Sequence, residues 1–75
     1  MRLISQNGKV DVNYEKCVLL AGEKYIEAKC GDDKYYMLAT YSKCEDVDKA
    51  MERLHHKYEL CSGKGVFKFP TDSEV

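Results

Sequence analysis

One segment of the chain repeats its apolar residues with the period of an α-helix, and this segment limits how the rest can fold. The apolar positions are Cys44, Val47, Met51, Leu54 and Tyr58, at spacings of three, four, three and four. That spacing puts all five side chains on one face of a helix. The opposite face is charged. We therefore predict one helix, over about residues 43–60, that buries a single face.

Both ends of the predicted helix have recognisable signals. Ser42 and Glu45 stand three apart, as in a capping box, in which the hydroxyl and the carboxylate each bind a backbone amide of the first turn. Gly63 and Gly65 follow the last apolar position and predict the end of the helix within residues 62–65.

The first forty residues have the shorter period of β-strands. Asn7-Gly8 separates residues 3–5 from the alternating residues 9–12 and predicts a type I′ hairpin. A second hairpin is predicted around Gly22, between residues 17–20 and 24–29. A turn over residues 30–33 leads to a strand over residues 34–40, and residues 66–69 form a last strand before Pro70.

This order predicts an α+β fold, with an antiparallel sheet of four to six strands and one helix packed on one face. The chain has 75 residues and is expected to be a single domain over residues 1–75, with residues 71–75 as a flexible tail. A core this small supplies about 3–5 kcal/mol of net stability. Association of the chain with itself is therefore an expectation at the outset.

Composition excludes some classes of protein. Twelve basic and thirteen acidic side chains give a formal charge of −1, so we expect no nucleic-acid partner. No apolar run approaches the roughly 20 residues of a membrane span, and the first residues lack the pattern of a signal peptide. We expect a cytoplasmic protein without a membrane partner, whose four cysteines are free thiols.

Six tyrosines indicate where a partner would bind, because tyrosine is enriched at protein interfaces. A single helix covers one side of a sheet and leaves the other side to water or to a partner. Tyr35 and Tyr36 are adjacent in a strand, so they point to opposite faces. The residues predicted to form the interaction surface are Tyr14, Tyr25, Tyr35 and Tyr41.

Patterns that would carry chemistry are incomplete. His55 and His56 lie near Glu52 and Glu59, but they make no HExxH motif, and we interpret them as a solvated helix face. Residues 62–65 contain two glycines and a lysine without the spacing of a phosphate-binding loop. Cys44 continues the apolar stripe, and Cys30 is in register with a strand, so both are expected in the core. The sequence predicts no catalytic residues, no metal and no cofactor.

Three stretches resemble small uncharacterised proteins from phages and mobile elements of Gram-positive gut bacteria. Their start, LISQ-x-G, matches Leu3-Ile4-Ser5-Gln6-Asn7-Gly8, followed by Asp11 and Tyr14-Glu15. Their helix resembles Tyr41-Ser42, Ala50-Met51, Leu54 and Tyr58. Their ending, VF-x-FP-x-D-x-EV, matches Val66-Phe67-Lys68-Phe69-Pro70-Thr71-Asp72-Ser73-Glu74-Val75.

The resemblance covers about half the chain and implies a phage or prophage origin, without implying catalytic residues. Members of the group more often have Asp before the first glycine and Pro where Asn13 stands. Longer members also carry an insertion before the last strand, so any role of that insertion does not transfer to this chain.

The leading interpretation is a non-enzymatic interaction protein in the host-cell cytoplasm. It would bind itself, as a homo-oligomer, and a host protein, through the face or edge of its sheet. One alternative is a protein that binds or sequesters a small ligand such as a nucleotide, at a site between protomers. Another is a zinc or redox module built from Cys17, Cys30, Cys44 and Cys61.

Overall fold

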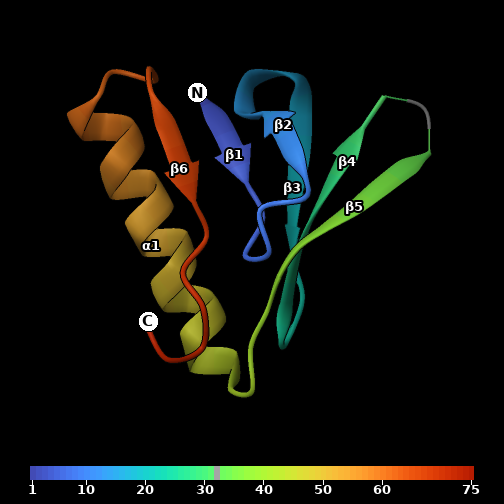
Figure 1. Ribbon diagram of the computed structural model, residues 1–75, viewed down its shortest axis with the longest axis vertical. Coiled ribbons are helices and arrows are strands. Elements are labelled where there is room, and N and C mark those ends of the chain that lie inside the picture. Colours follow the sequence, from blue (N-terminus) through green and yellow to red (C-terminus); the bar gives the residue numbers. More distant parts are fainter. Residues whose placement is uncertain (32) are drawn as a thin grey trace.

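The computed structural model describes residues 1–31 and 33–75. In chain order the elements are β1 (Arg2–Ile4), β2 (Asp11–Asn13), the 3-10 helix η1 (Tyr14–Lys16), β3 (Cys17–Ala21), β4 (Tyr25–Cys30), β5 (Lys34–Thr40), α1 (Cys44–Leu60) and β6 (Val66–Lys68). This combination of strands and one α-helix within the described residues confirms the predicted α+β class (Figure 1).

The strands form two sheets, so the prediction of one antiparallel sheet is wrong. The first sheet has the order β2-β1-β6 and the second sheet has the order β3-β4-β5. The chain leaves the first sheet at η1, where the Asn13 side chain accepts a hydrogen bond from the backbone N–H of Glu15 at 3.0 Å. This side-chain bond stabilises a local turn in place of continued strand pairing.

The first sheet is also mixed, and this was not predicted. β6 pairs with β1 in parallel, with Leu3 opposite Phe67, while β2 pairs with β1 antiparallel. A parallel pair requires a long crossover connection. Here the connection contains the whole second sheet and α1, as Figure 1 shows.

The first hairpin is confirmed, but its turn is not of type I′. The backbone N–H of Ser5 donates to Val10 at 2.9 Å, and that of Gly8 donates to Ser5 at 2.9 Å. Gly8 has φ +75°, while Asn7 is not among the residues with positive φ, which a type I′ turn would require. The Asn7 side chain instead accepts from the Lys9 N–H at 3.0 Å, which supports a longer loop.

The second sheet confirms the two predicted antiparallel pairings. Gly22 donates its N–H to the Tyr25 carbonyl at 2.8 Å and closes the β3–β4 hairpin. Between β4 and β5, Gly31 and Asp33 both have left-handed backbone angles, as the predicted turn requires. Asp32, also part of that predicted turn, lies outside the described residues. β5 contains a bulge, because Ile26 pairs with Ala39 while the next residue of β4 pairs with Met37.

The bulge alters which β5 residues enter the core. It leaves Leu38 as an extra residue between two paired positions. Leu38 and Ala39 are consecutive, and both are buried. The strand therefore places two neighbouring side chains in the core, although simple alternation would place only one there.

Helix α1 confirms the predicted segment, but its cap and its buried face differ from the prediction. The N-cap is Lys43, without a side-chain cap bond. The Ser42 N–H donates to the Asp72 carboxylate at 3.1 Å, so Ser42 lies outside the helix and the capping box does not form. The buried helix residues are Val47, Ala50 and Leu54. The stripe is thus centred on Ala50, and the prediction that Cys44 lies in the core is wrong because that residue is exposed.

The core lies between the helix and the inner faces of both sheets. Its buried apolar residues are Met1, Leu3, Ile26, Ala28, Leu38, Ala39, Tyr41, Val47, Ala50, Leu54, Phe67 and Phe69. Phe67 and Phe69 pack edge to face, with ring centroids 5.1 Å apart.

Gln6 connects the two sheets and the C-terminal segment. Its N–H donates to the Leu38 carbonyl at 2.9 Å. Its side-chain oxygen accepts from the Thr40 N–H at 2.9 Å, and its side-chain nitrogen donates to the carbonyls of Thr40 at 3.1 Å and Pro70 at 2.9 Å. One amide side chain therefore satisfies backbone groups at the edge of β5 that no strand pairs.

Residues 71–75, predicted to be a flexible tail, form a turn in the structure. The Thr71 N–H donates to the Glu74 carboxylate at 2.9 Å, and the Glu74 N–H donates to the Thr71 carbonyl at 3.0 Å. Val75 packs against the core cluster. Their mobility stays a prediction.

Candidate functional site

The second sheet has one buried face and one solvent face, and the middle strand β4 shows the contrast. Ile26 and Ala28 point inward and are fully buried. Tyr25, Glu27 and Lys29 alternate with them and therefore point outward. These three side chains follow the midline of the exposed face.

The strands on either side of β4 add large apolar side chains to the same exposed face. On the β3 side, Val18 lies opposite Lys29 and Leu20 opposite Glu27. On the β5 side, Tyr35 and Met37 lie opposite the same two residues. We call this surface the outer sheet face: Val18, Leu20, Tyr25, Glu27, Lys29, Tyr35 and Met37.

The apolar members of the outer sheet face are all exposed to solvent. Their exposed fractions range from 38% for Leu20 to 59% for Val18. Neighbouring apolar side chains of this kind mark interaction surfaces more often than scattered ones do. Tyr25 lies over Gly22, where an added Cβ would come within 2.3 Å of the tyrosine ring. Glycine at that position therefore leaves room for the ring.

The charges of the outer sheet face are central and of opposite sign. Glu27 and Lys29 are two residues apart on β4, so both stand on the same side of the strand. The Lys29 ammonium lies 5.8 Å from the centre of the Tyr35 ring, within the range of a cation–π contact. The face thus has a small dipolar centre with apolar side chains on both flanks.

The structure brings two of the four predicted interaction tyrosines onto this face. Tyr25 and Tyr35 belong to it. Tyr14 is half-buried against Tyr58, with ring centroids 4.9 Å apart. Tyr41 is 4% exposed. Tyr14 and Tyr41 therefore support the core, and we leave them out of the candidate interface.

The Tyr41 hydroxyl is already engaged within the molecule. It donates a hydrogen bond to the Pro70 carbonyl at 2.7 Å. Burial raises the pKa of Tyr41 to about 12, with the carboxylate of Asp72 acting in the same direction. The side chain stays a neutral phenol at physiological pH and holds the segment after β6 against the start of α1.

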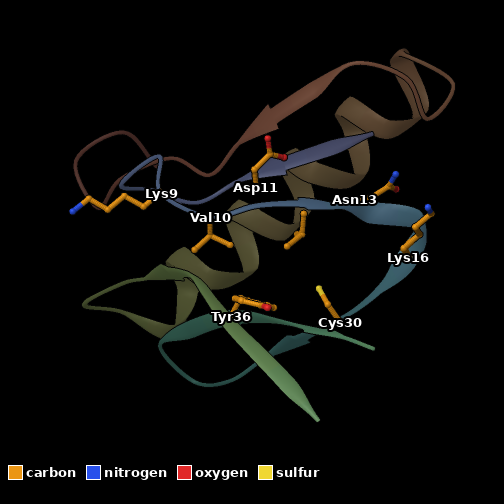
Figure 2. A pocket seen from close by; sticks show the side chains of 8 residues that line it. Lys9, Val10, Asp11, Asn13, Lys16, Cys30 and Tyr36 are labelled. Atoms are coloured by element: carbon orange, nitrogen blue, oxygen red, sulfur yellow. The ribbon is translucent and has the colours of Figure 1, made fainter. Parts of the chain in front are cut away.

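A cleft of about 450 Å³ lies between β2 and the inner face of the second sheet (Figure 2). Cavities of this size can hold a small molecule. Its lining consists of Lys9, Val10, Asp11, Val12, Asn13, Lys16, Cys30 and Tyr36. Figure 2 shows Val10 and Tyr36 facing each other from opposite walls. The cleft therefore has one aromatic wall, and Figure 2 shows Lys9 and Lys16 at its two opposite ends.

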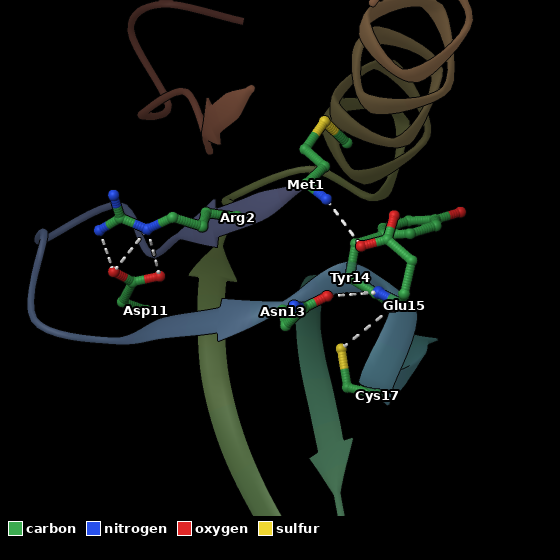
Figure 3. Close-up of polar contacts among 7 residues, drawn as sticks. All are labelled: Met1, Arg2, Asp11, Asn13, Tyr14, Glu15 and Cys17. Atoms are coloured by element: carbon green, nitrogen blue, oxygen red, sulfur yellow. Dashed lines mark hydrogen bonds and ion pairs between the residues drawn. The ribbon is translucent and has the colours of Figure 1, made fainter. Parts of the chain in front are cut away.

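Polar contacts fix the β2 wall of this cleft (Figure 3). The Arg2 guanidinium binds the Asp11 carboxylate through more than one hydrogen bond. These bonds lower the pKa of Asp11 below its ordinary value. At the other end of β2, the amino group of Met1 binds Glu15 at 2.7 Å, and this bond lowers the pKa of that carboxyl. Both carboxylates are thus paired, and the lysines of the cleft are not neutralised by them.

The cysteines divide into a pair and two separate thiols. Cys17 and Cys30 lie directly opposite each other on β3 and β4. Cys44 begins α1 and Cys61 follows it, at the two ends of a helix about 25 Å long. The zinc hypothesis requires the four sulfurs to converge, and they do not. Cys30, expected in the core, is partly buried and packs against the core cluster.

Among the residues that the structure describes, no group of three or more His, Cys, Asp or Glu side chains is placed to hold a metal ion. His55 and His56 are both exposed, as a solvated helix face requires. In the same described part of the chain, no helix has the length and apolar character needed to cross a membrane.

Sequence reasoning missed several residues of both surfaces. The strands containing Val18, Leu20 and Met37 were predicted, but their faces were not assigned. Pairing Cys17 with Cys30 across the Gly22 hairpin would have put Val18 and Leu20 on the same side as Glu27. The cleft had no such signal, because it depends on how the two sheets approach each other. Comparison with protein-family models, curated proteins and solved structures gave no match.

Proposed function

We propose that this protein is a non-enzymatic interaction protein and that the outer sheet face binds a second copy of the chain. Supporting this proposal are five exposed apolar side chains around two opposite charges at the centre of one sheet face. Sheets pack face to face in many proteins, with side chains of both faces interdigitating.

The charge arrangement is the observation that selects a second copy as the occupant. A two-fold axis that lies in the interface, perpendicular to β4 and level with Ala28, would place Glu27 of each copy against Lys29 of the other. The Glu27–Lys29 pair would then occur twice in one interface, as a two-fold interface requires of any contact. A partner surface that carries charges of only one sign would repel either Glu27 or Lys29, or leave it unpaired.

The size of the face predicts weak association. Three strands about 4.8 Å apart and five to seven residues long make a surface of about 15 by 20 Å. This area of about 300 Å² is below the roughly 800 Å² per partner that a standard stable interface buries. We expect a dimer whose population rises with concentration over the micromolar range.

Charge reversal at the two central residues tests the proposal. Glu27→Lys and Lys29→Glu should each weaken the dimer by at least about tenfold, because each variant opposes like charges twice. The double variant should dimerise again. A mixture of the two single variants should form a heterodimer, because each lysine then faces a glutamate. Sedimentation velocity over a concentration series measures all four cases.

Glu59→Lys is the matched control, since it reverses an exposed charge on α1, which contributes no residue to the outer sheet face. It should leave the dissociation constant unchanged. A wild-type chain that is monomeric at every concentration overturns the second copy as the occupant. So does a mixture of the two single variants that fails to associate while both remain folded. The host protein predicted from the phage resemblance would then be the partner to test on the same face.

The inter-sheet cleft favours a second candidate function, binding of a small anion that carries a planar ring. Tyr36 offers a ring surface, and Lys9 and Lys16 stand at the two ends of the cleft, where their long side chains could turn toward a bound anion. Unlike the nucleotide site predicted between protomers, this cleft lies within one chain. A thermal-shift screen of nucleotides tests it: a ligand should raise the melting temperature of the wild type and not of Lys9→Ala/Lys16→Ala. No shift with any nucleotide removes this class of ligand.

A further inference from the structure

Cys17 and Cys30 occupy directly opposite positions on neighbouring antiparallel strands. Opposite residues in such a ladder have Cα atoms about 4.5–5.5 Å apart, and their side chains leave the sheet on the same face. A disulfide requires Cα atoms about 4.4–6.8 Å apart. The backbone therefore already has the spacing that a bond between these sulfurs needs.

We propose that Cys17 and Cys30 form a reversible thiol–disulfide site, which a small disulfide such as oxidised glutathione converts to a cross-strand disulfide. The site belongs to the inner side of the second sheet and is independent of the outer sheet face. It needs no other cysteine of the chain, because the bond joins only these two sulfurs.

Both thiols are partly buried and line surface clefts, and they differ in what their sulfurs contact. Cys30 lines the inter-sheet cleft, and Figure 2 shows its sulfur directed toward β2 across that cleft. A small disulfide can approach it there. The Cys17 thiol is directed to the Tyr14 carbonyl, 3.8 Å away, and Figure 3 shows this contact beside η1. Cys30 is therefore the entry thiol and Cys17 the resolving thiol.

The proton affinity of Cys17 agrees with this order. Burial raises its pKa to about 11, with the neighbouring Cys30 acting in the same direction. A raised pKa lowers the fraction of Cys17 that is present as thiolate at neutral pH. The greater nucleophilicity of that thiolate offsets only part of this loss, so its reaction with a free disulfide is slower. Cys17 reacts faster with the mixed disulfide on Cys30, because that sulfur is held next to it.

The reaction balances in two exchange steps. The Cys30 thiolate attacks one sulfur of oxidised glutathione, forms a mixed disulfide and releases one glutathione thiolate. Cys17 loses its proton and attacks the Cys30 sulfur, which forms the cross-strand disulfide and releases the second glutathione thiolate. The protein gives up two thiol protons and two electrons, and glutathione disulfide becomes two glutathione thiols.

The experiment uses the full chain with Cys44→Ser and Cys61→Ser, incubated with oxidised glutathione and analysed by intact mass and peptide mapping. The expected product has lost two hydrogens, joins residues 17 and 30, and carries no glutathione. Adding Cys17→Ser should stop the reaction at one glutathione on Cys30. Adding Cys30→Ser should leave a thiol that is modified more slowly than the one in the Cys17→Ser chain, because the Cys17 thiol is engaged with the Tyr14 carbonyl.

Cys→Ala versions of the same variants, checked by circular dichroism, separate loss of the thiol from loss of the fold. Two stable glutathione adducts on a folded chain, without the cross-strand bond, would overturn the proposal. So would a wild-type chain that preferentially joins Cys17 or Cys30 to Cys44 or Cys61 under native conditions. Reaction in guanidinium should abolish the preference for this pair.

Discussion

The first and second sheets each have one face in the core and one face in solvent, but the solvent faces differ in chemistry. Outward positions of the first sheet are mostly polar: Arg2, Ile4, Asp11, Asn13, Val66 and Lys68. The Arg2–Asp11 ion pair crosses this face. Outward positions of the second sheet are mostly apolar, around Glu27 and Lys29. The first face is suited to water, whereas the second leaves apolar surface that a partner would cover.

The largest expected effect is a difference in the free energy of unfolding between substitutions on the two faces of the second sheet. Ile26→Ala removes a fully buried side chain from the inner face and should lower the free energy of unfolding by about 2–5 kcal/mol. Val18→Ala on the outer face should change it by less than about 0.5 kcal/mol. Urea denaturation of dilute protein measures both. Equal losses for the two variants would contradict the assignment of inner and outer faces.

The next effect concerns the connection between the sheets. Gln6→Ala removes three side-chain hydrogen bonds to backbone groups of Thr40 and Pro70 and should lower the free energy of unfolding by about 1–3 kcal/mol. Lys9→Ala, in the same loop, should have little effect. Hydrogen exchange should show faster exchange of the Thr40 amide in Gln6→Ala. Unchanged protection of that amide would mean that Gln6 does not hold the two sheets together.

A smaller effect compares the two solvent faces directly. Tyr35→Glu should weaken self-association by about tenfold, equivalent to about 1.4 kcal/mol, and should leave the monomer folded. Val66→Glu puts the same charge on the solvent face of the first sheet and should leave association unchanged. Both positions are about half exposed in the single chain. If the two variants weaken the dimer equally, the outer sheet face is not the contact surface.

The smallest effect is the response of the first sheet to acid. The pKa of Asp11 is lowered by the hydrogen bonds from Arg2, so its pairing stabilises the fold above the unfolded pKa and is lost as pH falls through the folded pKa. Stability should therefore decrease below about pH 4. In Asp11→Asn and in Arg2→Gln, the free energy of unfolding should depend less on pH over this acidic range, because each substitution removes the Arg2–Asp11 pair. Urea midpoints between pH 2 and pH 7 measure it.

The helix was predictable because its signal is local. A run of apolar residues at spacings of three and four identifies one face over four turns. Its cap was not predictable, because Ser42 donates to Asp72, a residue from the far end of the chain. A capping box forms only if no distant group binds the Ser42 amide instead of Glu45. A local sequence pattern does not say whether such a group is present.

The split into two sheets was not predictable for a related reason. It depends on the parallel pairing of β1 with β6, which are distant in sequence, and on the turn at η1. The hairpins of the second sheet connect neighbouring segments, and these were predicted. Tyr25 and Tyr35 were assigned to the exposed surface, but the inter-sheet cleft was not found, because its walls come from different sheets.

The pairing of Leu3 with Phe67 also determines when the protein can finish folding during its synthesis. The second sheet joins neighbouring segments and can form while the ribosome is still adding residues. The first sheet lacks its third strand until β6 has been translated, and until then one edge of β1 has no partner strand. A nascent chain that stalls before β6 would therefore present an unpaired strand edge and a core without Phe67 and Phe69, as a substrate for chaperones rather than as a folded domain.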